Sequence, residues 1–186
     1  KTFTLSRKQQ KEMGADFQGK TVHAVDDISF HCQPGRIFTL LGPNGAGKTT
    51  TLRMIATILK PSSGEILVSG YNTVSSGAEV RRRLGFLTGG TGLYDRLTPN
   101  ELIDYFGKLN SMDARELAKR KDELFTLLGI HEFANRRIGR FSTVMKQKVS
   151  IARTVIHDPE VVVFDEPTSG LDVIAAKSII DLIRNS

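Results

Sequence analysis

Residues 42–50, GPNGAGKTT, fit the complete pattern of a P-loop, in which spaced glycines precede a Lys-Thr pair. The apolar segment 36–41 before them favours a buried strand. Residues 50–59 after them favour a helix that ends before Pro61. A strand, a glycine-rich turn and a helix, in this order, form the context in which the motif binds phosphate. The sequence therefore predicts a phosphate-chain ligand held at the start of a helix.

The residue types of this motif suit that ligand. Gly42, Gly45 and Gly47 would let the backbone wrap closely around phosphates, while N–H groups and the positive end of the helix face the anion. Lys48 would reach the β- and γ-phosphates, and the Thr49 hydroxyl would ligate Mg²⁺. A glycine-rich loop that only caps a helix is the alternative, and the flanking segments argue against it. The predicted nucleotide-binding residues are Gly42, Pro43, Asn44, Gly45, Ala46, Gly47, Lys48, Thr49 and Thr50.

Composition places the chain among globular proteins. Its 186 residues, 39% hydrophobic and 25% charged, suffice for one domain with a sizeable core. No apolar run approaches the roughly 20 residues that span a bilayer. The single Cys32 excludes an internal disulfide and favours a reducing cytosol. The net charge of +6 is spread along the chain without interleaved aromatic residues, so we expect no nucleic-acid partner. Both ends look cut, because the chain begins with Lys and ends within a predicted helix at 173–185.

The first part of the chain is predicted to be rich in strands. Residues 22–30 favour a strand with Val25, Ile28 and Phe30 facing inward, after a polar and basic loop or insertion at 6–20. Beyond the P-loop helix, residues 64–68 favour a strand. A short basic helix at 78–83 and a core strand at 84–87 follow.

Residues 98–157 are predicted to be helical. The first helix begins at Thr98, which forms a capping-box pattern with Glu101. The second runs from about Asp113 to a C-cap at Gly129, and the third begins near Ser142. The apolar run 161–164 then indicates a strand buried on both faces, as in a parallel α/β sheet.

Two carboxylates at the end of that last strand complete a candidate site. In the run VVVFDE at 161–166, Asp165 could hold Mg²⁺ through a water molecule, and Glu166 could polarise an attacking water as a general base. A strand followed by an acidic turn is the alternative, and the P-loop upstream favours the functional interpretation.

Together these motifs resemble the ABC-type ATPases. The resemblance rests on GPNGAGKTT at 42–50, FSTVMKQKVSIAR at 141–153, VVVFDE at 161–166 and PTSGLD at 167–172. It implies an α/β P-loop NTPase of the ABC-ATPase type, with a RecA-like parallel-sheet core, an antiparallel β subdomain and an inserted helical subdomain. We expect a single ATP-binding domain over residues 1–186, truncated at its C-terminus, with the helical subdomain at about 92–157.

The resemblance also implies a mechanism. Such domains bind ATP and Mg²⁺, hydrolyse ATP as homodimers or heterodimers, and work with a separate transmembrane permease at the cytoplasmic face of the membrane. The signature residues of one subunit, Ser142, Thr143, Val144 and Met145, would close over the nucleotide of the other, and Asp172 would lie in the loop between the two sites. The signature segment resembles bacterial exporter ATPases, including those of sodium efflux, although no residue selects sodium.

Four departures from the family pattern reduce the expected activity. Val144 replaces a signature glycine, which predicts weaker closure of the ATP-bound dimer. Gly89 stands where the family has a Gln, and a switch His would lie beyond residue 186, so we expect binding to exceed turnover. Phe17 is the candidate for stacking on adenine, with Val22 as an alternative that could only pack.

Two further functions remain open at this point. A soluble ABC-type ATPase acting on the ribosome or DNA is disfavoured, because residues 48–140 hold neither sustained heptads nor cysteine. A non-catalytic nucleotide-binding partner of a heterodimer is favoured by Val144 and Gly89 and disfavoured by the intact Glu166. The leading prediction is the ATP-hydrolysing subunit of an exporter.

Overall fold

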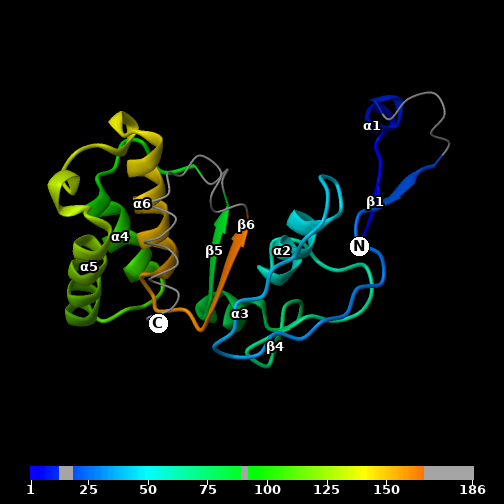
Figure 1. The fold of residues 1–186 in the computed structure, drawn as a ribbon, viewed down its shortest axis with the longest axis horizontal. Coiled ribbons are helices and arrows are strands. Elements are labelled where there is room, and N and C mark those ends of the chain that lie inside the picture. The colour runs from blue at the N-terminus through cyan, green and yellow to red at the C-terminus, as the bar shows by residue number, and fades with distance from the viewer. Residues whose placement is uncertain (13–18, 89–91, 166–186) are drawn as a thin grey trace. The chain divides into compact units, whose positions relative to one another are not determined.

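A computed structural model describes residues 1–12, 19–88 and 92–165 and divides the chain into two units, Lys1–Gly77 and Ala78–Ser186 (Figure 1). Phe17, Gly89, Glu166, Asp172 and the predicted helix at 173–185 lie outside the described residues. The elements are β1 (Thr2–Thr4), α1 (Arg7–Glu12), β2 (Thr21–His23), α2 (Lys48–Ile55), β3 (Leu67–Val68), β4 (Tyr71–Asn72), α3 (Gly77–Arg83), β5 (Leu84–Thr88), α4 (Pro99–Leu109), α5 (Ala114–Leu128), the 3-10 helices η1 (His131–Phe133) and η2 (Ile138–Arg140), α6 (Thr143–Val155) and β6 (Val161–Asp165).

The unit Lys1–Gly77 contains two antiparallel strand pairs. Thr2 of β1 lies opposite His23 of β2, and the short helix α1 follows β1 within the predicted insertion. Leu67 of β3 lies opposite Asn72 of β4, so the strand predicted at 64–68 is limited to its last two residues. The antiparallel pairing expected for this part of the chain is therefore present in short form.

The prediction of a buried strand at 36–41, in the same unit, is wrong. These residues form no strand, and the side chains of Ile37 and Leu41 are 68% and 89% exposed. Ile28 and Phe30 are also exposed, contrary to prediction, whereas Val25 is buried. An apolar, β-favouring sequence becomes a strand only where a second backbone pairs with its N–H and C=O groups, and residues 36–41 have no such neighbour among the described residues.

The P-loop helix differs from its prediction at both ends. Helix α2 begins at Lys48, two residues before the predicted start, and ends at Ile55 rather than residue 59. Thr57 follows with a φ of 62°, a left-handed conformation that a helix cannot contain. The backbone conformation after Ile55 therefore ends the helix earlier than the run of apolar residues predicted.

The unit Ala78–Ser186 contains the predicted parallel strand pair. Leu84 of β5 lies opposite Val161 of β6, and Thr88 lies opposite Asp165. Helix α6 packs closely on this pair: a Cβ added at Gly85 would lie 2.6 Å from the Thr154 carbonyl oxygen. A glycine in β5 thus permits the close approach of helix and sheet.

The three predicted helices are confirmed together with their caps. The Thr98 hydroxyl accepts a hydrogen bond from the Glu101 N–H at 3.2 Å, and the Glu101 carboxylate accepts one from the Thr98 N–H at 2.8 Å. The bond from the Thr98 N–H, together with a second that the Thr98 hydroxyl donates to the same carboxylate at 3.0 Å, lowers the pKa of Glu101. Asp113 caps α5, which ends at Gly129 with a φ of 62°. The helices enclose a core whose largest fully buried side chains include Leu102, Ile103, Leu124, Phe125 and Ile151. No described helix is long and apolar enough to cross a membrane.

His157 lies at the junction between α6 and β6 with both ring nitrogens buried. Neither nitrogen has a hydrogen-bond partner among the described residues. Burial lowers the pKa of His157, against smaller opposing effects of the Leu84 backbone and the Asp158 carboxylate. The folded protein therefore favours the neutral imidazole.

We expect this histidine to make stability depend on pH. The unfolded chain binds the proton at an ordinary pKa of about 6.5 and the folded chain resists it, so the free energy of unfolding falls as the pH drops below that value. Denaturant unfolding between about pH 8 and pH 5 measures the effect. His157→Leu should flatten the curve in this range, and an unchanged slope would assign the pH dependence to other groups.

Candidate functional site

The predicted phosphate-binding loop forms a tight turn that leads directly into α2. Gly45 and Gly47 both adopt a φ of +84°, a conformation that favours glycine. Gly47 is the N-cap of α2, no side chain caps the helix, and its first turn contains no acidic residue. The first backbone N–H groups of α2 therefore remain suited to an anion rather than to a side chain.

The ammonium group of Lys48 lies across the start of this loop. Its Nζ donates hydrogen bonds to the carbonyl oxygens of Gly42 at 2.7 Å and Pro43 at 2.8 Å. The Ala46 N–H donates to the Pro43 carbonyl at 3.2 Å, which closes the turn beneath the lysine. The loop therefore combines a positive side chain with backbone donors, the chemistry required to hold a phosphate chain.

The backbone of Gly47 lies against residues 24–25, which precede the loop, and this close contact requires a residue without a side chain. A Cβ added at this position would lie 2.2 Å from the Ala24 carbonyl oxygen and 3.0 Å from Val25 Cγ2. The Thr51 hydroxyl donates to the Gly47 carbonyl at 3.0 Å from within the first turns of α2. Sequence analysis did not identify Ala24 as a support, because no local pattern marks a contact across more than 20 residues. It also missed Thr51, whose position four residues after Gly47 was a local signal.

Asp165 lies at the carboxyl end of β6 in the unit Ala78–Ser186. Its side chain is 7% exposed, and the strand register places Thr88 beside it at the end of β5. Ligands of open parallel sheets bind at the carboxyl ends of their strands, and a carboxylate oxygen is a donor that Mg²⁺ prefers. Sequence analysis missed Thr88, whose place directly after the strand predicted at 84–87 was the available signal.

The signature residues form the start of α6. Ser142 is the N-cap, and its hydroxyl accepts a hydrogen bond from the Met145 N–H at 3.3 Å. Thr143 is exposed, Val144 is half-buried, and Met145 packs partly against the core. The predicted hydroxyl cap is confirmed, and Val144 lies within the first helical turn, where the resemblance described above predicts a glycine.

The structure thus gathers the predicted residues into two groups. Residues 42–50 lie together in the unit Lys1–Gly77, whereas Asp165 and residues 142–145 belong to the unit Ala78–Ser186. Phe17, Gly89, Glu166 and Asp172 lie outside the described residues, so their roles stay predictions.

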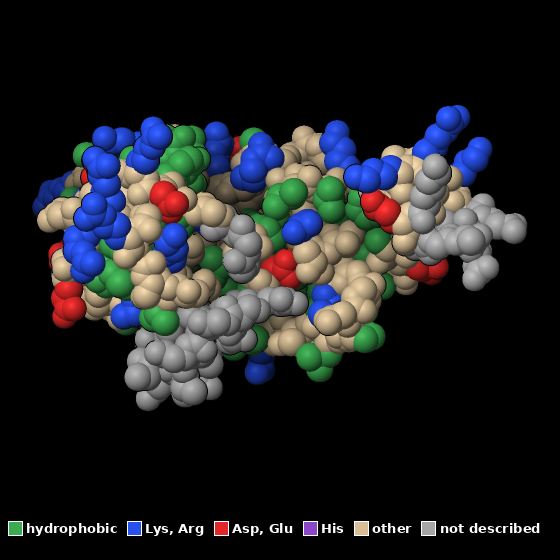
Figure 2. All heavy atoms as spheres, turned by 90° about the horizontal axis from the view of Figure 1, so that it is seen from above, with side chains coloured by type: hydrophobic (Ala, Val, Ile, Leu, Met, Phe, Trp, Pro, Cys, Tyr) green, Lys and Arg blue, Asp and Glu red, His purple; other side chains and the backbone are tan. Residues whose placement is uncertain are grey.

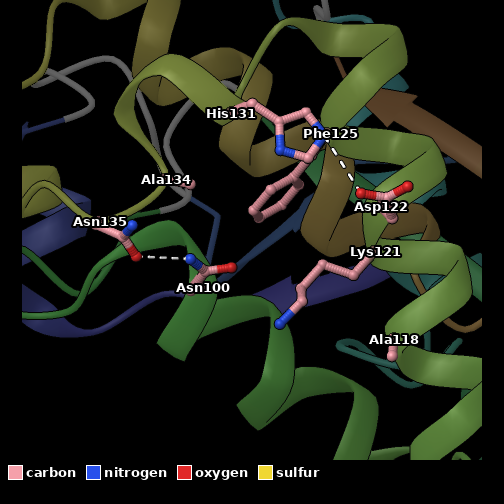
Figure 3. A pocket seen from close by; sticks show the side chains of 8 residues that line it. All are labelled: Asn100, Ala118, Lys121, Asp122, Phe125, His131, Ala134 and Asn135. Atoms are coloured by element: carbon pink, nitrogen blue, oxygen red, sulfur yellow. Dashed lines mark hydrogen bonds and ion pairs between the residues drawn. The ribbon is translucent and has the colours of Figure 1, made fainter.

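A separate hollow of about 240 Å³ lies among α4, α5 and the loop after α5 (Figure 3). Asn100 donates to Asn135 at 2.8 Å on one side, and His131 lies 3.5 Å from Asp122 on the other. The Lys121 ammonium is bonded to Asp104 at 2.7 Å. Asp104 therefore offsets the charge of Lys121, and none of the eight residues that line the hollow is a glycine.

Comparisons with known proteins identify the motifs. A family model described as ABC transporter matches residues 25–169. The ABC transporter ATP-binding protein NatA of Bacillus subtilis (strain 168) is 48% identical over 166 residues, which cover 89% of this chain and 68% of NatA. The bacitracin transport ATP-binding protein BcrA of Bacillus licheniformis is 36% identical over 87% of this chain, which spans only 52% of BcrA.

A solved structure of an ATP-binding cassette has the same fold. It is a dimeric post-hydrolysis state of the cassette MJ0796 bound to ADP and Pi, with a TM-score of 0.81 and 25% identity. The match covers 98% of this chain and 78% of the cassette.

The two left-handed glycines of the loop give a matched pair of substitutions. Gly45→Ala meets no atom within 4 Å and should cost only the left-handed strain of about 1–2 kcal/mol. Gly47→Ala adds the clash with the Ala24 carbonyl and should cost more than about 3 kcal/mol. Denaturant unfolding without nucleotide separates the two variants. Equal losses would show that strain alone, and not contact with Ala24, requires glycine at position 47.

Proposed function

Because the chain belongs to the ABC transporter family as an ATP-binding subunit, we propose that it hydrolyses ATP at the P-loop to energise export through a separate membrane subunit. One observation carries the proposal: the Lys48 ammonium donates hydrogen bonds to the Gly42 and Pro43 carbonyls of a loop that leads into the uncapped start of α2. ABC ATPases couple ATP hydrolysis to transport, and this loop has the backbone and charge needed to hold the triphosphate.

We assign roles to residues on the same basis. The loop residues 42–50 bind the nucleotide, Lys48 neutralises its β- and γ-phosphates, and Glu166 polarises the attacking water. Phe17 stacks on the adenine, and Gly89 takes the place of the residue that relays the state of the γ-phosphate. The Thr49 hydroxyl and the Asp165 carboxylate offer the oxygen donors that Mg²⁺ prefers. When bound, Mg²⁺ would offset negative charge on the phosphate oxygens.

The proposal extends to assembly. Two ATPase subunits would join head to tail, with Ser142, Thr143, Val144 and Met145 facing the partner's nucleotide and Asp172 lying between the two sites. The dimeric cassette bound to ADP and Pi supports dimerisation. Residues 1–186 would form one ATP-binding domain whose helical subdomain, about 92–157, meets the membrane subunit at the cytoplasmic face of the membrane.

The transported substrate is a finer proposal. The motifs resemble sodium-efflux ATPases, and sodium is therefore our candidate, while the bacitracin transport protein BcrA offers a peptide as the competing class. Flux of each substrate through the assembled transporter separates the two. Val144 also favours a second candidate function, a non-catalytic partner of a heterodimer, which the hydrolysis experiment below tests.

Mg-ATP binding and steady-state hydrolysis test the proposed activity on the full-length protein. Lys48→Ala should abolish detectable ATP binding, because it removes the cation that crosses the loop. Glu166→Gln should keep binding and lower turnover by about a hundredfold or more, the usual effect of losing a general base. Wild-type binding without turnover would identify the non-catalytic partner instead. Absence of binding would reject both functions.

The signature substitution predicts a weak closed dimer. Val144→Gly should strengthen ATP-driven dimerisation several-fold by allowing backbone to approach the phosphate, although glycine in a helix costs up to about 1 kcal/mol. Val144→Ala is the matched control, since it removes the branched side chain and keeps helix propensity. Both variants and the parent carry Glu166→Gln in addition, and their sedimentation with ATP measures how tightly each dimerises. If neither variant dimerises more tightly than the parent, Val144 does not limit closure.

A further inference from the structure

The loop that joins α5 to α6, residues 131–141, is firmly anchored to the helical core. Ile138 is completely buried, and the rings of Phe133 and Phe141, also buried, meet edge to face at 5.1 Å. The Ile138 N–H donates to the Leu97 carbonyl and the Gly139 N–H to the Asp95 carbonyl, both at 3.0 Å. Little conformational freedom therefore remains in this backbone.

We name residues 131–141 the arginine loop, because the segment presents three exposed arginines, Arg136, Arg137 and Arg140. Within the described part of the chain, their side chains make no ion pair or hydrogen bond. Nearby acidic groups are already engaged: Glu101 with Thr98, and Asp95 with Lys146 at 3.3 Å. Among the described residues, hydrogen bonds from Thr98 and the charge of Arg137 lower the pKa of Glu101, and Glu132 on η1 is exposed on the same loop, so two carboxylates partly offset the three positive charges. Figure 2 shows Lys and Arg side chains gathered over the helical part of this unit.

The surroundings of the arginine loop narrow the class of partner. Its apolar side chains, Phe133, Ala134, Ile138 and Phe141, are all buried, so nothing is available to insert into a lipid layer. Three charges, each worth about 1 kcal/mol at an anionic membrane, give weak binding by themselves. The exposed aromatic ring of the loop is that of His131, which already contacts Asp122 and the ring of Phe125, so the loop offers no free stacking platform for nucleic-acid bases. Guanidinium groups on a fixed backbone instead match carboxylates, which they bind through paired hydrogen bonds.

We propose that Arg136, Arg137 and Arg140 form a docking surface for an acidic cytoplasmic segment of the transporter's membrane subunit. This inference rests on the proposed function, because it names what that partner must carry: Asp or Glu side chains opposite the arginine loop. Because the loop is ordered before contact, docking would immobilise only side chains, which favours binding through few charged pairs. The contact would weaken as salt concentration rises.

Co-purification of the co-expressed membrane subunit with the tagged full-length ATPase tests the proposal. Arg136→Glu with Arg137→Glu should lower recovery of the membrane subunit at least about tenfold, since attraction becomes repulsion. Replacing both residues by Lys should lower it only about threefold, because charge is kept and paired hydrogen bonding is lost. The matched control, Lys20→Glu with Lys60→Glu, makes the same charge change on exposed lysines and should leave recovery unchanged. Melting temperatures confirm that each variant is folded.

The outcomes separate this inference from the proposed function. Failure of the wild-type ATPase to recover the membrane subunit would reject both. Normal recovery with the Arg136→Glu and Arg137→Glu variant, or equal loss with the lysine control, would reject the arginine loop alone. Flotation with vesicles of equimolar phosphatidylcholine and phosphatidylglycerol adds a direct comparison. Vesicle binding that the arginine variant abolishes, with membrane-subunit recovery intact, would replace the peptide partner by lipid.

Discussion

The P-loop of the unit Lys1–Gly77 depends on one constraint, the left-handed backbone at Gly47, which lies against the Ala24 carbonyl. No side chain fits between these two segments, so the loop can turn into α2 only with glycine at this point. The turn aims the first N–H groups of α2 and places Lys48 over the Gly42 and Pro43 carbonyls. Binding chemistry in this loop therefore follows from a steric requirement of the backbone.

Helix α6 has two functions in the other unit. Its buried face packs on β5, where Gly85 permits the Thr154 carbonyl to approach closely, and its residues Val149, Ile151 and Ala152 belong to the core. Its first turn presents Ser142 and Val144 at the surface proposed to meet a partner's nucleotide. The later part of α6 is buried in the core, and this packing fixes the position of the exposed start of the helix, where the signature residues lie.

Charge on this unit is distributed in a similar way. Ion pairs join Lys121 to Asp104 and Arg120 to Asp158, so these cations of α5 lie against carboxylates of other parts of the unit. The arginines of the loop between η1 and α6 differ, because anchoring of their backbone by buried Ile138 leaves the side chains in solvent. Stability resides in the apolar side chains of that loop, and its charges remain available for recognition.

Local sequence signals determined a large part of this protein. Capping residues Thr98, Asp113 and Ser142 predicted where the three helices begin, because a cap and its N–H donor lie within three residues. The glycine pattern likewise predicted the loop around Lys48. Only the tertiary structure decided that residues 36–41 pair with no strand among the described residues, that Ala24 supports Gly47 and that Thr88 lies beside Asp165. Strand pairing and backbone contact join distant residues, and no local pattern specifies which distant segment will arrive.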